Sequence, residues 1–188
     1  EENEFSMLAP ISSWNNPLNW AILPLLNDIQ NKDDIKLLVD TFYNKAWLRD
    51  IYFITLGFFE TGDMETTKNA AKALLTVFVK HKDKINWAIE NKPNEAWQYI
   101  HARFHPETFE EYWEEWGNSQ NDAVGEVLNL LVTLELMGES VIETQDEKDM
   151  VQKIVDYLIA IEYWGDDDNG IWEENLEVHA SSIGSCVA

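Results

Sequence analysis

The sequence has little cysteine and few basic residues. A single cysteine, Cys186, in 188 residues excludes an internal disulfide framework and a cysteine-rich zinc site. Thirteen Lys and Arg stand against 35 Asp and Glu, which gives a formal net charge of -22. Such a charge repels phosphate backbones and anionic lipid surfaces. We therefore expect no nucleic acid and no membrane among the partners of this protein.

Long apolar runs are also absent. No stretch has the length needed to span a bilayer, and residues 1–5 lack the basic and apolar regions of a signal peptide. These absences predict a cytoplasmic protein. The hydrophobic content of 45% is enough for a full core, so we expect one domain over residues 1–188.

Aromatic residues, in contrast, are abundant. The nine Trp and six Tyr are many for this length. Core packing would use most of them, but exposed aromatic faces can also stack on a neutral ligand such as a sugar.

Apolar residues at helical spacing predict a series of helices. Asp63 and the pair Thr144 and Glu147 have the spacing of helix-start caps, and Gly138 that of a helix end. The expected helices are, in order, 16–30, 34–43, an all-apolar helix from 50 to 59 that is covered on every side, an amphipathic helix from 63 to 79, an apolar helix from 123 to 134, an amphipathic helix from 144 to 161, and an apolar helix that begins near 180. Residues 81–120 are predicted to be an irregular, aromatic-rich functional loop.

The chain repeats one plan: a Trp with acidic residues, an apolar helix, then an amphipathic helix that shields it. This plan occupies 47–79 and 116–161 and begins again at Trp172. Alternating inner and outer helices predict a two-layer toroid in which the segments that lead into the inner helices meet at one end. The residues expected in a shared pocket there are Trp47, Arg49, Asp50, Trp116, Gln120, Asp122, Trp172 and Glu173.

Glu173 and Glu174 directly follow Trp172. A carboxyl against an indole loses water, and an ionised neighbour disfavours its charge further, so one of the two glutamates would stay protonated as a general acid. The plainer interpretation is an acidic surface loop.

Three segments resemble glycoside hydrolase family 15, the glucoamylase family, and its relatives, the N-terminal regions of the phosphorylase kinase alpha and beta subunits. Ala-Trp-Leu-Arg-Asp (46–50), Trp-Gly-Asn-Ser-Gln-Asn-Asp (116–122) and Gly-Ile-Trp-Glu-Glu (170–174) are similar to family motifs in the same order. The resemblance covers about 46–188. Residues 169–173 and 179–184 look closer to the phosphorylase-kinase-like branch.

The resemblance implies an all-α fold, the N-terminal portion, about half, of an (α/α)6 toroid. It also implies inverting hydrolysis of an α-glucosidic bond without cofactor or metal. Glu173 would be the general acid and Glu174 would bind the sugar on the leaving side. Arg49 and Asp50 would hold hydroxyls of the terminal sugar. Trp47, Trp116 and Trp172 would form walls of the pocket. Structural alternatives remain for these residues: an ion pair between Arg49 and Asp50, a helix cap at Asp122, and three core tryptophans.

An inverting enzyme needs a second carboxylate as base, about 6.5 to 9.5 Å from the acid. In the family that base lies in the C-terminal half of the ring. We therefore expect the domain to be incomplete at its C-terminus and to associate with the missing half in a longer protein, or else with a second chain that completes the ring. The alternative function is a non-catalytic carbohydrate-sensing or regulatory domain like that of phosphorylase kinase.

Other groups of residues give weaker evidence for a functional site. Residues 166–170 fail the calcium-loop pattern and predict a turn. His101 and His105 have helical spacing but no glutamate between them, which disfavours a metalloprotease-type site. Ser181 and Ser182 are expected to cap a helix, and Cys186 to be a small buried hydrophobe.

Overall fold

The computed structural model describes residues 45–112, 119–171 and 175–188. These residues are mainly helical, and a single two-residue pairing joins β1 to β2. The elements are β1 (Ala46–Trp47), α3 (Leu48–Glu60), α4 (Met64–Lys80), α5 (Lys82–Asn91), the 3-10 turn η3 (Ala96–Gln98), β2 (Arg103–Phe104), α6 (Asn121–Leu136), α7 (Gln145–Ala160) and α8 (Ala180–Val187). The helices predicted over 16–30 and 34–43 lie outside the described residues.

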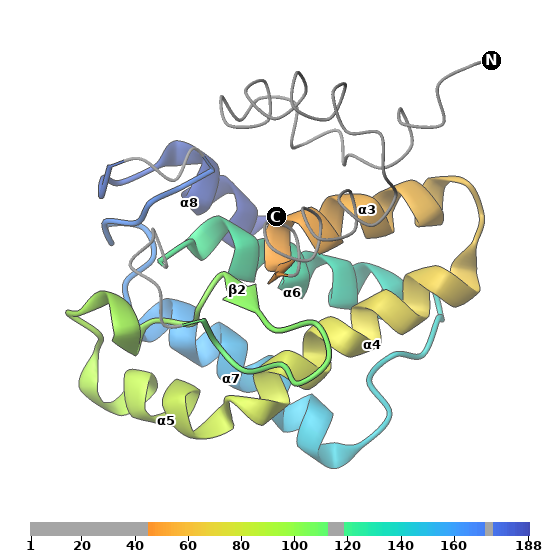
Figure 1. Cartoon of the computed structure of the whole chain (residues 1–188), viewed down its shortest axis with the longest axis horizontal. Helices are drawn as coiled ribbons and strands as arrows, with labels where there is room; N and C mark the ends of the chain where they lie inside the picture. Colours follow the sequence, from red (N-terminus) through yellow and green to blue (C-terminus); the bar gives the residue numbers. More distant parts are fainter. Residues whose placement is uncertain (1–44, 113–118, 172–174) are drawn as a thin grey trace, which may run out of the picture. The chain divides into compact units, whose positions relative to one another are not determined.

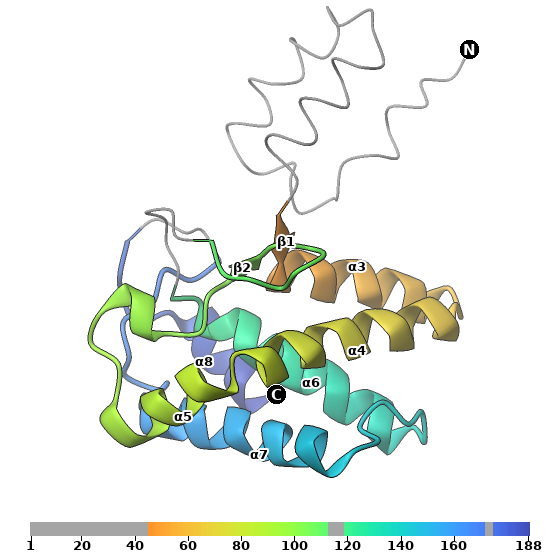
Figure 2. The ribbon, with the colours of Figure 1, turned by 60° about the horizontal axis from the view of Figure 1, so that its bottom comes forward.

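The described helices form two layers (Figure 1). α6 packs against both α3 and α8, and these three helices are the inner layer. α4 packs on α3, α6 and α7, and α5 packs on α7 and α4, so α4, α5 and α7 are the outer layer. Figure 1 shows α4, α5 and α7 on the side of α6 away from α3, and in the turned view of Figure 2 α4 is seen between α3 and α7. The predicted alternation of apolar and amphipathic helices is confirmed for these elements.

Local chemistry sets several helix ends as predicted. The Asp63 carboxylate accepts the Thr66 backbone N–H at 3.1 Å and starts α4. Thr144 and Glu147 form a reciprocal capping box at the start of α7. Gly138, at φ 84°, follows the end of α6, where a side chain would be strained.

The outer layer buries one stripe of each helix. On α4 this stripe includes Leu74, Leu75 and Phe78, each with at most 1% of its surface exposed. Burying a side chain of this size stabilises a fold by about 1.5 to 3 kcal/mol. The stripe therefore fixes α4 on the inner helices.

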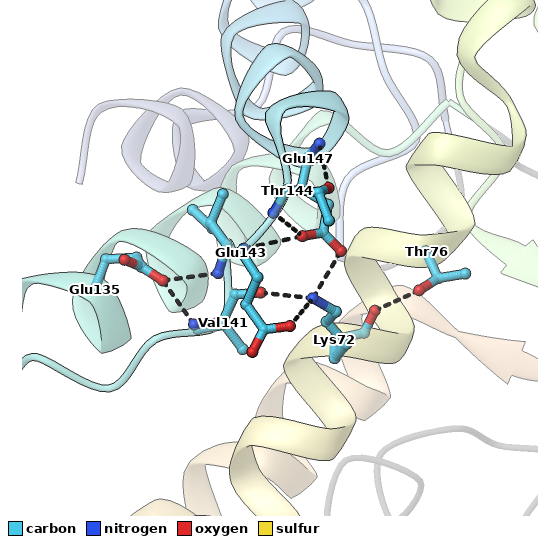
Figure 3. A network of polar contacts seen from close by, with 8 residues as sticks. Lys72, Thr76, Glu135, Val141, Glu143, Thr144 and Glu147 are labelled. Atoms are coloured by element: carbon cyan, nitrogen blue, oxygen red, sulfur yellow. Dashed lines mark hydrogen bonds and ion pairs between the residues drawn. The ribbon is translucent and has the colours of Figure 1, made fainter.

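Lysines of α4 and α5 connect the outer layer to acidic residues of the connecting loops. Lys72 contacts the carboxylates of Glu143 and Glu147 and the carbonyl of Val141 (Figure 3). Burial raises the pKa of Glu147, but Lys72 and the backbone N–H groups of Thr144 and Glu143 outweigh it and lower this pKa to about 2. The same arrangement recurs in the pairs Lys68–Glu139, Lys80–Glu110 and Lys84–Glu111.

Two helix predictions are wrong. Residues 82–91 were expected to be irregular, but they form α5, which is separated from α4 by His81 alone. Its buried residues are only Ile85 and Ala88. So short an apolar face, without a side-chain cap, gives a weak helical pattern in the sequence.

The prediction that α3 is covered on every side is also wrong. Leu48, Arg49 and Thr55 are buried, but Phe53 is 44% exposed and Ile54 43%. The apolar surface of α3 therefore exceeds what α4 and α6 cover. In the part of the chain that the structure describes, no helix is long and apolar enough to cross a membrane.

Candidate functional site

The Arg49 guanidinium lies at the junction of three chain segments. Arg49 stands in the first turn of α3 and is 7% exposed. Its Nε donates to Asp122 Oδ2 at 2.8 Å and its Nη2 to Asp122 Oδ1 at 3.0 Å. Nη2 also donates to Gln120 Oε1 at 2.9 Å and to the Gly170 carbonyl at 3.1 Å. A planar guanidinium fork suits this two-oxygen contact with a carboxylate.

These contacts bring together parts of all three sequence motifs. Gln120 and Asp122 belong to the segment that starts α6, and Gly170 lies just before Trp172 in the sequence. Of the predicted site residues, the structure therefore joins Arg49, Gln120 and Asp122 directly. Trp116, Trp172, Glu173 and Glu174 lie outside the described residues.

Two of the structural alternatives, the ion pair of Arg49 with Asp50 and the helix cap at Asp122, differ from what the structure shows. The ion pair of Arg49 is with Asp122, which is 2% exposed. The N-cap position of α6 is occupied by Gln120, and Asp122 lies inside the first turn. Asp122 therefore acts as the buried counter-ion of Arg49.

Trp47 precedes α3 and is half-buried. The Arg103 guanidinium carbon lies 5.0 Å from the centroid of its ring, a cation–π distance. The Leu48 backbone N–H donates to the Ala102 carbonyl at 3.0 Å, next to the β1–β2 pairing. This pairing holds Trp47 and Arg49 at the same end of α3.

Residues 166–170 are not a simple surface turn. Asp168 is fully buried, and its Oδ2 accepts the Asn121 backbone N–H at 2.8 Å. Asp166 Oδ2 accepts from the Asn121 side chain at 3.0 Å, and Asp166 Oδ1 accepts the Tyr99 hydroxyl at 2.9 Å. The Asn169 N–H donates to the Ser119 carbonyl at 2.8 Å. This segment is thereby bound to the start of α6.

Gly170 ends that segment in a backbone conformation that favours glycine. Its φ is +55°, and a Cβ built there would lie 2.7 Å from the ring of His179. Any side chain at this position would displace His179 or the carbonyl that Arg49 binds.

Glu126 is a functional candidate that the sequence reasoning missed. It lies one turn after Asp122 on α6, and 8% of its surface is exposed. Burial, followed by the charge of Asp122, raises the pKa of Glu126 to about 8, although Arg49 opposes the shift. Asp50 adds a smaller repulsion. Within the described ranges, Glu126 Oε2 has no hydrogen-bond partner. The i, i+4 spacing from Asp122 is the one signal in the sequence that could have indicated this acid.

The histidines and serines have local roles. His101 Nδ1 accepts the Arg103 backbone N–H at 3.0 Å, and burial lowers the pKa of His101 to about 4. Among residues 45–112, 119–171 and 175–188, no group of three or more His, Cys, Asp or Glu is arranged to hold a metal ion. The prediction that Ser181 and Ser182 cap α8 is wrong. The N-cap residue is His179, and no side chain makes a cap hydrogen bond there.

Cys186 packs beside the core. It is partly buried, and its Sγ lies 3.4 Å from the Asn121 carbonyl, to which it donates. Burial raises the pKa of this thiol to about 12, so it remains protonated. This agrees with its expected role as a small hydrophobe.

Comparison with known proteins identifies the family of this chain. The family model of glycosyl hydrolases family 15 matches residues 29–188, and the chain belongs to this family. The match begins earlier than the resemblance seen in the motifs. A search of curated proteins gave no match.

Solved structures of glycosidases share the fold. A glycosidase in which one glutamate is replaced by alanine aligns with a TM-score of 0.64 at 21% identity. A second such variant in complex with glucose and a wild-type glycosidase each align with a TM-score of 0.62 at 22% identity. Each alignment covers 76% of this chain and 38% of the glycosidase chain. The all-α class is confirmed, and the coverage agrees with a portion of an (α/α)6 toroid.

Proposed function

We propose that this chain supplies the acid side of an inverting α-glucosidase site. Glu173 is the general acid that protonates the leaving oxygen, and Glu174 binds the sugar on the leaving side. Asp50 and Arg49 bind hydroxyls of the terminal sugar. Trp47, Trp116 and Trp172 are the walls of the pocket.

The contacts of Arg49 carry this proposal. One guanidinium holds the start of α6 through Asp122 and Gln120, and it holds the segment before Glu173 through the Gly170 carbonyl. A hexose site built from three distant motifs requires such a junction, because each motif alone is too short to enclose a sugar. Family membership supports carbohydrate as the substrate class.

The base of the proposed reaction lies outside this chain. The chain spans 38% of the length of the similar glycosidases, and inversion needs a carboxylate on the other face of the sugar. We infer that further helices of the ring, in the same protein or in a second chain, supply this carboxylate. They would also cover the exposed apolar side chains of α3, Phe53 and Ile54.

Hydrolysis of a short α-glucoside by the protein at its full natural length tests the proposal. The expected result is turnover that Glu173→Gln reduces by at least about 100-fold, the usual contribution of a general acid. Glu177→Gln, an exposed carboxyl shortly after it in the sequence, is the matched control and should retain turnover. Polarimetry of the released glucose distinguishes inversion from retention.

A different outcome would favour the regulatory function. If wild type and Glu173→Gln bind a glucoside equally and neither hydrolyses it, the site senses carbohydrate without chemistry. If no glucoside binds, the proposal fails.

A further inference from the structure

Two tryptophans of the outer layer lie together on the surface. Trp87 on α5 is 39% exposed and Trp97 on η3 is 58% exposed. Their ring centroids are 6.3 Å apart and the ring planes are inclined by 28°. Large apolar side chains in contact with each other at the surface mark a binding patch more often than isolated ones do.

Packing of the hydrophobic core does not explain the position of these two tryptophans. α5 packs against α7 and α4 through its buried residues Ile85 and Ala88. Trp87 lies between them in sequence, on another face of the helix, and remains exposed. The two indoles therefore contact each other while keeping free surface.

A rigid turn holds Trp97 in place. Gln98 is buried, and its Oε1 accepts the backbone N–H groups of Asn94 at 2.8 Å and Glu95 at 3.0 Å. Glu95 and Gln98 complete a capping box around η3. Since these bonds are satisfied within the turn, the pair is organised before any ligand arrives, which lowers the cost of binding.

The surroundings favour a neutral, hydroxyl-rich ligand. Glu90, Asn94 and Glu95 are exposed next to the pair in sequence and offer acceptors for hydroxyl groups. The net charge of -22 disfavours anions such as nucleic acids. The apolar C–H face of a sugar ring matches an indole face.

We propose that Trp87 and Trp97 form a secondary binding platform for a chain of α-linked glucose, separate from the Arg49 site. The choice of glucose rests on the proposed function. The platform would hold a long glucan while its end is processed, so it affects long substrates and spares short ones.

Binding of maltoheptaose, followed by calorimetry, tests the platform. Trp97→Ala and the double variant with Trp87→Ala should raise the dissociation constant about tenfold, the loss expected for about 1.4 kcal/mol of stacking. Trp97→Phe keeps an aromatic face and should restore most of the affinity. Trp164→Ala is the matched control, since Trp164 is 53% exposed and packs edge-on against Tyr163.

The readouts separate this proposal from the proposed function. Turnover of a short α-glucoside by the full-length protein should be equal in wild type and the Trp97 variants. Loss of turnover on Glu173→Gln, together with weaker maltoheptaose binding in the Trp97→Ala and double variants, supports both proposals. Binding at Trp97 in a protein without turnover would sustain the platform alone.

Two results would overturn the platform. One is equal affinity for maltoheptaose in wild type and in the double variant. The other is a change in sedimentation mass on Trp97→Ala without a change in affinity, which would make the patch a contact between protein chains.

Discussion

Arg49 and Asp122 form a two-pronged ion pair between α3 and α6. They are 73 residues apart in the chain, and both are buried. Arg49 also donates to Gln120 Oε1 and to the carbonyls of Gly170 and Ile171. The pair joins the inner helices to the segment that leads to the proposed acid.

Removing one partner of this pair should destabilise the protein. Arg49→Met leaves a buried carboxylate without its cation, and we expect the free energy of unfolding to fall by about 3 to 5 kcal/mol. Urea unfolding measures this change. The double variant Arg49→Met/Asp122→Leu removes both charges and should recover much of the loss. Equal losses in the single and double variants would show that the charge pair is not the cause.

Glu126 should make stability depend on pH. Its pKa is 4.5 when unshifted and about 8 in the folded protein. Between these values the folded state keeps a proton that the unfolded state has lost. The free energy of unfolding therefore falls as pH rises, by up to about 1.4 kcal/mol per pH unit.

Glu126→Gln removes that titration. The free energy of unfolding of the variant minus that of wild type should be larger at pH 8 than at pH 5. Urea unfolding at both pH values measures this difference. Glu107→Gln, which changes an exposed carboxyl, is the matched control. Parallel pH profiles for wild type and Glu126→Gln would contradict the assignment.

Gly125 allows α6 and α8 to approach closely. A Cβ at this position would lie 2.6 Å from the backbone carbon and oxygen of Ser185 and 2.7 Å from the Cys186 nitrogen. Gly125→Ala should therefore lower thermal stability by forcing the helices apart, at a cost of about 1 to 3 kcal/mol. Gly57→Ala on α3 is the matched control, because nothing lies within 4 Å of its Cβ. That variant should gain about 1 kcal/mol from helix propensity.

Asp168 should be needed to hold the segment before Trp172. Asp168→Ala leaves the buried N–H of Asn121 without an acceptor and should cost about 1 to 3 kcal/mol of stability. Asp168→Asn keeps an acceptor oxygen and should retain more of it. If the proposed function holds, turnover should fall more than glucoside affinity in Asp168→Ala, and Asp168→Asn should restore part of it. Equal stability in the two variants would exclude this role.

The local features of the fold were predictable from sequence. The caps at Asp63 and Thr144 act within three residues, so spacing alone identifies them. The helix at 82–91 was missed because its buried face has only two residues. The exposed apolar side chains of α3 were not predicted, because the apolar composition of a helix does not tell which other helices pack against it.

The candidate site was predictable as a set of residues but not as a set of contacts. Motif order indicated that Arg49, Gln120 and Asp122 would meet, yet the sequence offered Asp50 as an equal ion-pair partner. The choice of Asp122 depends on how α6 crosses α3. The elevated pKa of Glu126 arises from burial and from neighbours on two helices, which no local pattern reports.

The lysine-to-loop pairs of the outer layer make the connecting loops respond to ionic strength. Lys68, Lys72 and Lys80 each hold a partly exposed glutamate from a loop, while the apolar stripe beneath α4 does not depend on charge. Added salt weakens such partly exposed pairs and leaves apolar packing intact. Protease cleavage at 105–112 and 139–143 should therefore accelerate in concentrated salt well before the helices melt.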